Sequence, residues 1–187
     1  MRQWVTKYFA KIIWLIIVLL LSSGCQRAYS PYARESERLP QRVLSVRDPG
    51  AQKIVNRLNR QGVTVISMGQ NYLVSIPAAL LFAGESPRIR WESYAVLNDV
   101  VCYLNQFRKI GVDVSAFSSQ YVSPSRERAL TSARARVVAD YLWSQDIDSR
   151  FVFTRGLGSD KPIISAYGGG DRNSNARVEI TFRNAVA

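Results

Sequence analysis

Apolar residues recur at helical intervals in three segments between residues 49 and 145. Intervals of three and four residues place side chains on one face of a helix. Each helix is predicted to begin where a polar capping residue precedes a proline, at Asp48-Pro49, Ser86-Pro87 and Ser123-Pro124. The buried face is expected at Leu97, Val100, Val101, Leu104 and Phe107 in the second helix, and at Leu130, Ala133, Val137 and Tyr141 in the third.

Five shorter segments are rich in β-branched and aromatic residues, as strands are. Their predicted bounds are 63–68, 72–76, 112–117, 151–154 and 177–182. A turn at Gly69-Gln70-Asn71 predicts that the first two form a hairpin, and Gly156 and Gly158 are expected to form a turn after the fourth. The order helix, strand, strand, helix, strand, helix, strand, strand predicts one domain, from 48 to 187, with helices packed on a sheet.

The first 25 residues follow a different pattern. Residues 12–21 are all apolar, basic residues precede them, and Ser22-Ser23-Gly24 and then Cys25 follow. Such a run is too short to span a bilayer, which needs roughly 20 residues, and the whole layout is typical of a secretory signal peptide. Because the LSSGC stretch also resembles a bacterial lipobox, we predict cleavage after residue 24 and lipid attachment to Cys25. An uncleaved membrane anchor with an incidental cysteine is the alternative.

Residues 25–47 are polar, mixed in charge and without a period, so they are predicted to be a lipidated tether ahead of the domain. Gln26 is not the aspartate that retains lipoproteins at the inner membrane of enteric bacteria. We therefore expect a lipid anchor in the outer membrane, with outer-membrane lipid bound through Cys25 and the domain in the periplasm.

The formal net charge is +11, and removing Arg2, Lys7 and Lys11 with the signal peptide leaves 11 − 3 = +8. A basic protein outside the cytoplasm meets anionic lipid headgroups, anionic glycan strands or acidic protein surfaces. Nucleic acid is not an expected partner in that compartment.

Histidine is absent, and Cys25 and Cys102 are the only cysteines. Without histidine, a Ser-His-Asp triad and a zinc site of the usual kind are excluded. Cys102 falls within an apolar helical pattern and is predicted to be a buried, inert thiol. We therefore expect no cofactor, no metal ion and no enzymatic activity.

Four sequence stretches carry a resemblance to a known family. LFAGESPRI follows a strand, LTSARARVV lies on the third helix, GLGSDKPI forms a loop, and NSNARVEI begins the last strand. In this order and at this spacing they resemble the OmpA-like peptidoglycan-binding domain, over residues 63 to 183. The resemblance implies an α+β fold with a mixed β-sheet backed by helices. It also implies a peptidoglycan stem peptide as the ligand.

The family site binds diaminopimelate, which presents an ammonium and carboxylates together. The LSxxRA motif of the family supplies an arginine for a carboxylate, and here that residue is Arg134. A planar guanidinium suits this role because it binds a carboxylate at two points. The NRRV motif reads Asn175-Ala176-Arg177-Val178 here, so Asn175 and Arg177 are retained and the first arginine of the motif is replaced.

The family aspartate, fifteen residues before Arg134, is Ser119 in this chain. A hydroxyl does not replace a carboxylate that faces an ammonium. Glu127 lies seven residues before Arg134, two helical turns, so both share one helix face. Glu127 is therefore a candidate for the missing negative charge. The alternative is a surface glutamate that pairs with Arg128 or Arg134.

Two functions follow from the resemblance. The first is a structural outer-membrane lipoprotein that anchors to peptidoglycan. The whole chain also resembles a lipoprotein of a type IVB secretion apparatus, which implies other secretion-complex subunits as partners. The second is a degenerate OmpA-like fold that acts only as a protein–protein interaction module within such a complex.

Overall fold

The computed structural model describes residues 49–120, 123–147, 149–164 and 174–185. The predicted signal peptide, Cys25, the tether and Asp48 lie outside the described residues. Val43–Ala187 form one compact unit, and all of the described residues belong to it. No helix in the described part of the chain is long and apolar enough to cross a membrane.

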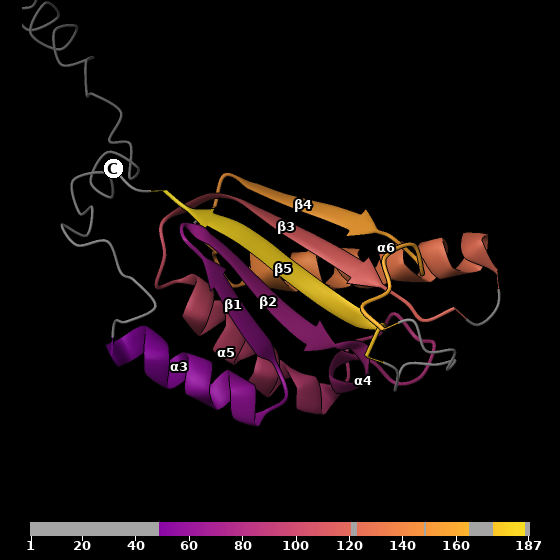
Figure 1. The fold of residues 1–187 in the computed structure, drawn as a ribbon, viewed down its shortest axis with the longest axis horizontal. Coiled ribbons are helices and arrows are strands. Elements are labelled where there is room, and N and C mark those ends of the chain that lie inside the picture. Colours follow the sequence, from indigo (N-terminus) through magenta and orange to yellow (C-terminus); the bar gives the residue numbers. More distant parts are fainter. Residues whose placement is uncertain (1–48, 121–122, 148, 165–173, 186–187) are drawn as a thin grey trace, which may run out of the picture. The chain divides into compact units, whose positions relative to one another are not determined.

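Five strands form one sheet in the order β1-β2-β5-β3-β4 (Figure 1). β3 and β4 are parallel, and the other neighbouring pairs are antiparallel. The mixed sheet expected from the family resemblance is therefore confirmed, and each predicted strand is present. The bounds are β1 Thr64–Met68, β2 Asn71–Pro77, β3 Lys109–Phe117, β4 Phe151–Gly156 and β5 Arg177–Asn184.

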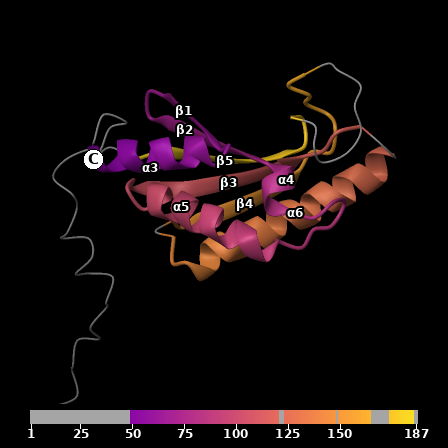
Figure 2. The same ribbon diagram turned by 90° about the horizontal axis from the view of Figure 1, so that it is seen from below.

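The helices lie on one face of the sheet (Figure 2). Residues that alternate along the central strands, such as Val112, Val114 and Ala116 of β3, point to that face and are fully buried. The opposite face is not covered by any described helix (Figure 2). The bounds are α3 Pro49–Arg60, α4 Ala78–Leu81, the 3₁₀ helix η2 Trp91–Ser93, α5 Tyr94–Leu104 and α6 Pro124–Ser144.

The predicted start of the second helix at Ser86-Pro87 is wrong. Ser86 Oγ accepts a hydrogen bond from the Arg88 amide at 3.0 Å, which makes a local turn instead of a helix cap. The segment is tied back to α4 by the Arg90 amide, which donates to the Leu81 carbonyl at 2.9 Å. Helical structure begins only with η2, and α5 follows at Tyr94. The short helix α4 was not predicted from the sequence.

α6 begins as predicted, with Ser123 accepting from the Arg126 amide at 3.5 Å and proline in the first turn. The buried face expected for this helix is wrong, because Leu130 and Val137 are only partly buried. The helix is rotated by about one residue, and its buried positions include three polar side chains. These positions are Glu127, Thr131, Arg134, Ala135, Val138, Ala139 and Leu142.

The second-helix apolar face was predicted correctly, and all five of its residues are buried. Cys102 lies between them in the sequence but is exposed, so the predicted buried thiol is wrong. Two of its neighbours, Val101 and Tyr103, occupy the inward positions instead. An apolar segment of this kind does not by itself decide which single residue points outward.

The core of the domain includes a cluster of four aromatic rings, from Tyr72, Tyr103, Phe107 and Phe182. The Tyr72 ring lies 4.5 Å from Phe107 and 5.1 Å from Phe182 between centroids. Burial, and then the neighbouring Tyr72, raise the pKa of Tyr103 above its usual range. The core runs from Val55 on α3 to Phe182 on β5, so the described part of the chain closes its own core.

Gly156, expected to form a turn, lies instead at the end of β4 against α6. A Cβ atom there would lie 2.2 Å from the backbone nitrogen of Ser132, so only glycine lets the strand and the helix approach this closely. We predict that Gly156→Ala lowers the free energy of unfolding by about 2 kcal/mol or more, as overpacking does. Urea denaturation of the domain measures this.

Gly111→Ala is the matched control, since its added Cβ would meet the Phe153 ring at an ordinary 3.6 Å. Equal midpoints for the two variants would contradict the assigned close approach of β4 and α6.

Candidate functional site

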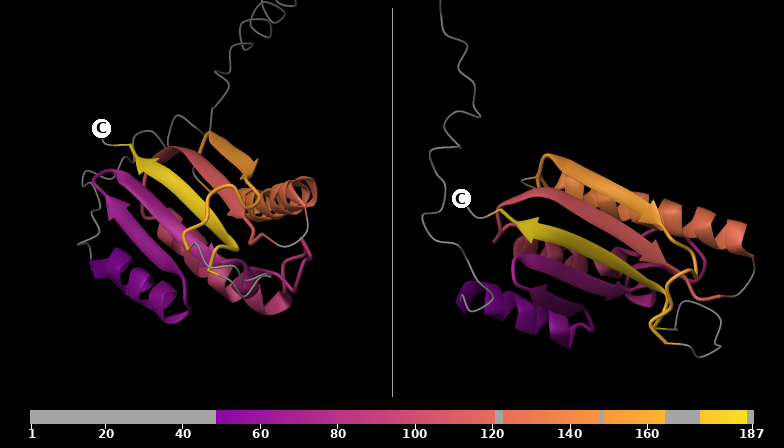
Figure 3. Two further views of the ribbon diagram at one scale, coloured as in Figure 1. Left: turned by 45° about the vertical axis from the view of Figure 1, so that its right-hand side comes forward. Right: turned by 45° about the horizontal axis from the view of Figure 1, so that its top comes forward.

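Several elements end together at one end of the sheet, which we call the site end. β3 and β4 finish there and β5 begins there, as the register pairs Phe117 with Arg177 and Ala116 with Gly156 (Figure 3). The Ser118 amide, just beyond β3, donates to the Gly158 carbonyl at 2.8 Å. The candidate residues predicted from the sequence come from the segments that meet here.

Arg134 is fully buried on α6. Its Nε donates to the Ser86 carbonyl at 3.1 Å, and its Nη2 donates to the Gly84 carbonyl. The guanidinium also lies over the Phe82 ring, 4.7 Å from the centroid. A buried charge needs such partners, so Arg134 fastens the 82–90 segment to α6. Phe82, Gly84 and Ser86 all lie within the LFAGESPRI stretch. The sequence alone did not predict that this stretch contacts Arg134.

Glu127 is 2% exposed and lies on the same buried face of α6 as Arg134. The shared face was predicted, and the alternative of a surface glutamate is wrong. Ser159 donates its hydroxyl proton to Glu127 Oε2 at 2.7 Å. The adjacent Thr131 hydroxyl accepts from the Gly158 amide at 3.0 Å. The loop after β4 therefore packs directly on this acidic position.

Ser119 is 2% exposed and comes two residues after the end of β3. It thus lies at the site end, where the resemblance places the family aspartate. The neighbouring Ser118 Oγ is also buried and has no hydrogen-bond partner in the part of the chain that the structure describes. This turn therefore carries hydroxyl groups and no carboxylate.

Arg177 is buried at the start of β5, beside an aromatic ring and three acceptors, one of which is the Asn175 carbonyl at 3.1 Å from Nη1. Its Nε donates to Glu179 Oε1 at 2.6 Å, and its Nη2 donates to the Lys161 carbonyl at 3.3 Å. Its guanidinium lies 3.9 Å from the centroid of the Phe117 ring. Glu179 was not singled out in the sequence, although its place two residues after Arg177 puts both on one face of the strand.

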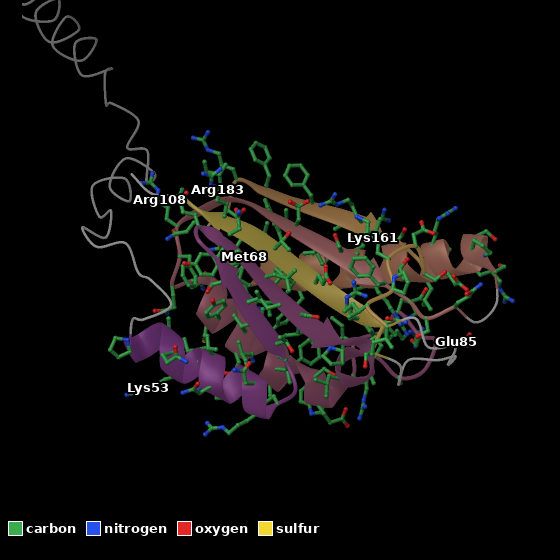
Figure 4. The ribbon with its side chains drawn as sticks, in the orientation of Figure 1. Lys53, Met68, Glu85, Arg108, Lys161 and Arg183 are labelled. Atoms are coloured by element: carbon green, nitrogen blue, oxygen red, sulfur yellow. The ribbon has the colours of Figure 1, made fainter. Side chains whose placement is uncertain are left out.

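Asn175 holds the loop before β5. Its Oδ1 accepts from the amides of Ile163 and Ile164 at 2.8 and 2.9 Å, and its Nδ2 donates to the Ile164 carbonyl at 2.8 Å. The side chain is 6% exposed. Asn175 and Arg177 therefore fix residues 161–164, whose Lys161 lies at the site end, on the same side of the molecule as Glu85 (Figure 4).

Two buried guanidinium groups, of Arg134 and Arg177, and one buried carboxylate, of Glu127, therefore lie next to the loops at the site end. Hydrogen bonds to the protein hold these cations and this anion in fixed positions. Such an arrangement suits a ligand that carries charges of both signs. Among the described residues there is no group of three or more histidine, cysteine, aspartate or glutamate side chains that could hold a metal ion.

The model of the OmpA family matches residues 81–176, just over half of the chain, and the protein therefore belongs to the OmpA family. The match includes α6 and most of the site end. The expected OmpA-like fold and the family recognition are confirmed.

Curated relatives include the probable lipoprotein YiaD of Escherichia coli (strain K12), which is 28% identical over 130 residues, 70% of this chain and 59% of that protein. The peptidoglycan-binding protein ArfA of Mycobacterium tuberculosis (strain ATCC 25618 / H37Rv) is 30% identical over 101 residues, 54% of this chain and 31% of that protein. The chain therefore spans less than two thirds of the length of these relatives.

Among solved structures, the cell wall anchor of the T6SS from Pseudomonas aeruginosa is similar with a TM-score of 0.61 and 26% identity. The match covers 74% of this chain and 99% of that chain. The periplasmic domain of Helicobacter pylori MotB (residues 78–256) has a TM-score of 0.56 at 20% identity, covering 67% and 83%. The second likeness shows the fold alone.

We predict that Asn175→Ala frees residues 163–164 without unfolding the sheet. The variant loses three side-chain hydrogen bonds to the backbone, so the amides of Ile163 and Ile164 should exchange with solvent at least about tenfold faster, as expected for losing about 1.5 kcal/mol or more. Amide hydrogen exchange followed by NMR measures this. Asn59→Ala, at an exposed position on α3, serves as the control, and unchanged protection of both amides in Asn175→Ala would contradict the assignment.

Proposed function

We propose that the protein is a structural outer-membrane lipoprotein whose OmpA domain binds the stem peptide of peptidoglycan. The observation that carries this proposal is the buried Arg134, in the motif position of the family arginine, on the same helix face as buried Glu127. Arg134 receives a carboxylate of the ligand, and Glu127 supplies the charge that faces its ammonium. No catalytic role is proposed.

The names of two groups of relatives support the choice of ligand. ArfA is a peptidoglycan-binding protein, and a peptidoglycan-associated lipoprotein of Mesorhizobium japonicum is 24% identical over 106 residues, 57% of this chain and 63% of that protein. The lipid anchor rests on Cys25 and the lipobox resemblance. Two or three acyl chains give stable membrane attachment, whereas one does not.

A finer role is also part of the proposal. The whole chain resembles DotK (IcmN), a lipoprotein of the Dot/Icm type IVB secretion apparatus, and we propose a structural place in the outer-membrane core of such a machine. Its other subunits are then protein partners. A wall-bound domain on a lipid anchor would hold that core in position.

The domain Val43–Ala187 should co-sediment with purified peptidoglycan sacculi. We predict that Glu127→Gln weakens binding about tenfold or more, because a hydrogen bond to a charged group contributes about 1.5–3 kcal/mol. The amide keeps the acceptor for Ser159, so the fold is retained. Arg134→Ala should weaken binding as well, and thermal melting separates that loss from loosening of the 82–90 segment.

Glu92→Gln is the matched control for Glu127→Gln. Glu92 is an exposed acid paired with Arg90 at 3.5 Å, away from the buried face of α6. Binding should be unchanged in this variant. Wild-type protein that stays in the supernatant, or equal binding by all three variants, would exclude the peptidoglycan proposal.

The second candidate function is an interaction module that does not bind the wall. Ser119 and Ala176, which stand where the family has an aspartate and an arginine, favour it. The substitution Ser119→Asp separates the two candidates. If the wild-type domain binds sacculi, Ser119→Asp should bind at least as tightly, because it adds the family carboxylate. Binding that appears only in Ser119→Asp would mean that the natural site has lost its ligand.

A further inference from the structure

The end of the sheet opposite the site end has a distinct surface, which we call the basic end. It combines three exposed arginines with exposed apolar side chains. Figure 4 shows two of these arginines and Met68 on the side of the molecule away from Lys161 and Glu85. The residues of the basic end are Met68, Arg108, Ile110, Arg150, Phe151 and Arg183.

Backbone hydrogen bonds bring these residues together from distant parts of the chain. The Arg150 amide donates to the Ile110 carbonyl at 2.9 Å, and the Ala185 amide donates to the Arg108 carbonyl at 2.7 Å. Phe151 lies opposite Gly111 in the parallel pair of β3 and β4. The surface therefore lies at the hydrogen-bonded ends of β3, β4 and β5.

An open pocket of about 380 Å³ lies at the basic end. Arg183 lines it and donates through Nε and Nη2 to Gln70 Oε1, at 3.2 and 3.1 Å. Lys109, 4% exposed, adds a cation beneath this surface and donates from Nζ to the Phe107 carbonyl at 3.2 Å. The remaining lining residues are Gln70, Ile110, Gly111, Asn184 and Ala185.

The charges of the three arginines at the basic end are not neutralised by ion pairs among the described residues. Arg108, Arg150 and Arg183 have no salt bridge there, whereas Asp113, the acid on the uncovered face of β3, is paired with Arg155 at 2.9 Å. The basic end therefore attracts anions from solution.

Apolar side chains stand beside these cations. Ile110 is 60% exposed, Met68 62% and Phe151 52%, and the Phe151 ring stacks with Phe153 at 5.9 Å. Exposed aromatic and aliphatic groups next to arginines are the composition of surfaces that lie at the interface of an anionic bilayer. The aromatic and aliphatic groups enter the headgroup region and the cations pair with phosphates.

We propose that the basic end is a membrane-docking surface for anionic phospholipid headgroups. α3 begins at the same end (Figure 1), and Pro49 follows Cys25 by 49 − 25 = 24 positions. That length reaches at most about 80 Å when extended, so an anchor on Cys25 allows both docking and release. Docking turns the site end away from the membrane. The proposal does not depend on wall binding.

The test uses the domain Val43–Ala187, which closes its own core and matches nearly the whole of a solved chain. The domain should float with vesicles of phosphatidylglycerol and phosphatidylethanolamine, and not with vesicles of phosphatidylcholine. Replacing Arg108, Arg150 and Arg183 together by glutamine should lower the partition coefficient about tenfold or more. No sacculi are present, so the result is independent of the wall-binding assay.

The matched control replaces three exposed arginines elsewhere, Arg88, Arg126 and Arg136, by glutamine. It removes the same net charge and should retain most of the binding. An equal loss of vesicle binding in both triple variants would mean that binding depends on net charge alone, and would overturn the proposal. Absence of flotation with anionic vesicles would also overturn it, and would leave an acidic protein as the partner of this surface.

A second measurement locates the contact. In the Cys102→Ser background, a fluorophore on Ile110→Cys should be quenched by spin-labelled lipids in anionic vesicles, whereas one on Ser125→Cys, at the start of α6, should not. Equal quenching at the two positions would mean that the domain binds without the proposed orientation.

Discussion

The placement of β5 in the middle of the sheet is the constraint on which the rest of the domain depends. The last strand pairs with β2 on one side and β3 on the other, so it joins the first hairpin to the parallel pair. Its first residue, Arg177, lies opposite Phe117 at the site end, and Arg183 lies opposite Asn71 at the basic end. Both surfaces of interest are therefore built on the two ends of one strand.

Burial of charge determines the geometry of the site end. Arg134 and Arg177 are each nearly removed from water, and unpaired they would destabilise the fold strongly. Backbone carbonyls of Gly84, Ser86 and Lys161 supply acceptors. Residues 82–90 and 161–164 are thus positioned by Arg134 and Arg177, the two residues that the family resemblance assigns to the ligand.

The features predicted correctly from the sequence are those set by neighbouring residues. The features that were missed depend on how distant segments pack together. Strands and the Ser123 cap were predicted because β-branched runs and a serine before a proline act within a few residues. Ser86-Pro87 has the same local appearance, but Ser86 bonds to Arg88 in a turn. The rotation of α6 was missed because hydrophobic periodicity assigns polar residues to the surface, whereas Glu127 and Arg134 are buried at the site. Their shared face was predicted from spacing alone.

The separation of the two ends has a mechanical consequence. If the proposed lipid anchor and the proposed wall contact both hold, load enters the domain at the start of α3, at the basic end, and leaves it at the site end, at the opposite tips of the strands (Figure 1). The first element to bear this load is α3, which is held to the domain by its buried residues Ala51, Val55 and Leu58. Under both proposals, the packing of α3 on the rest of the domain would set the force that the link withstands.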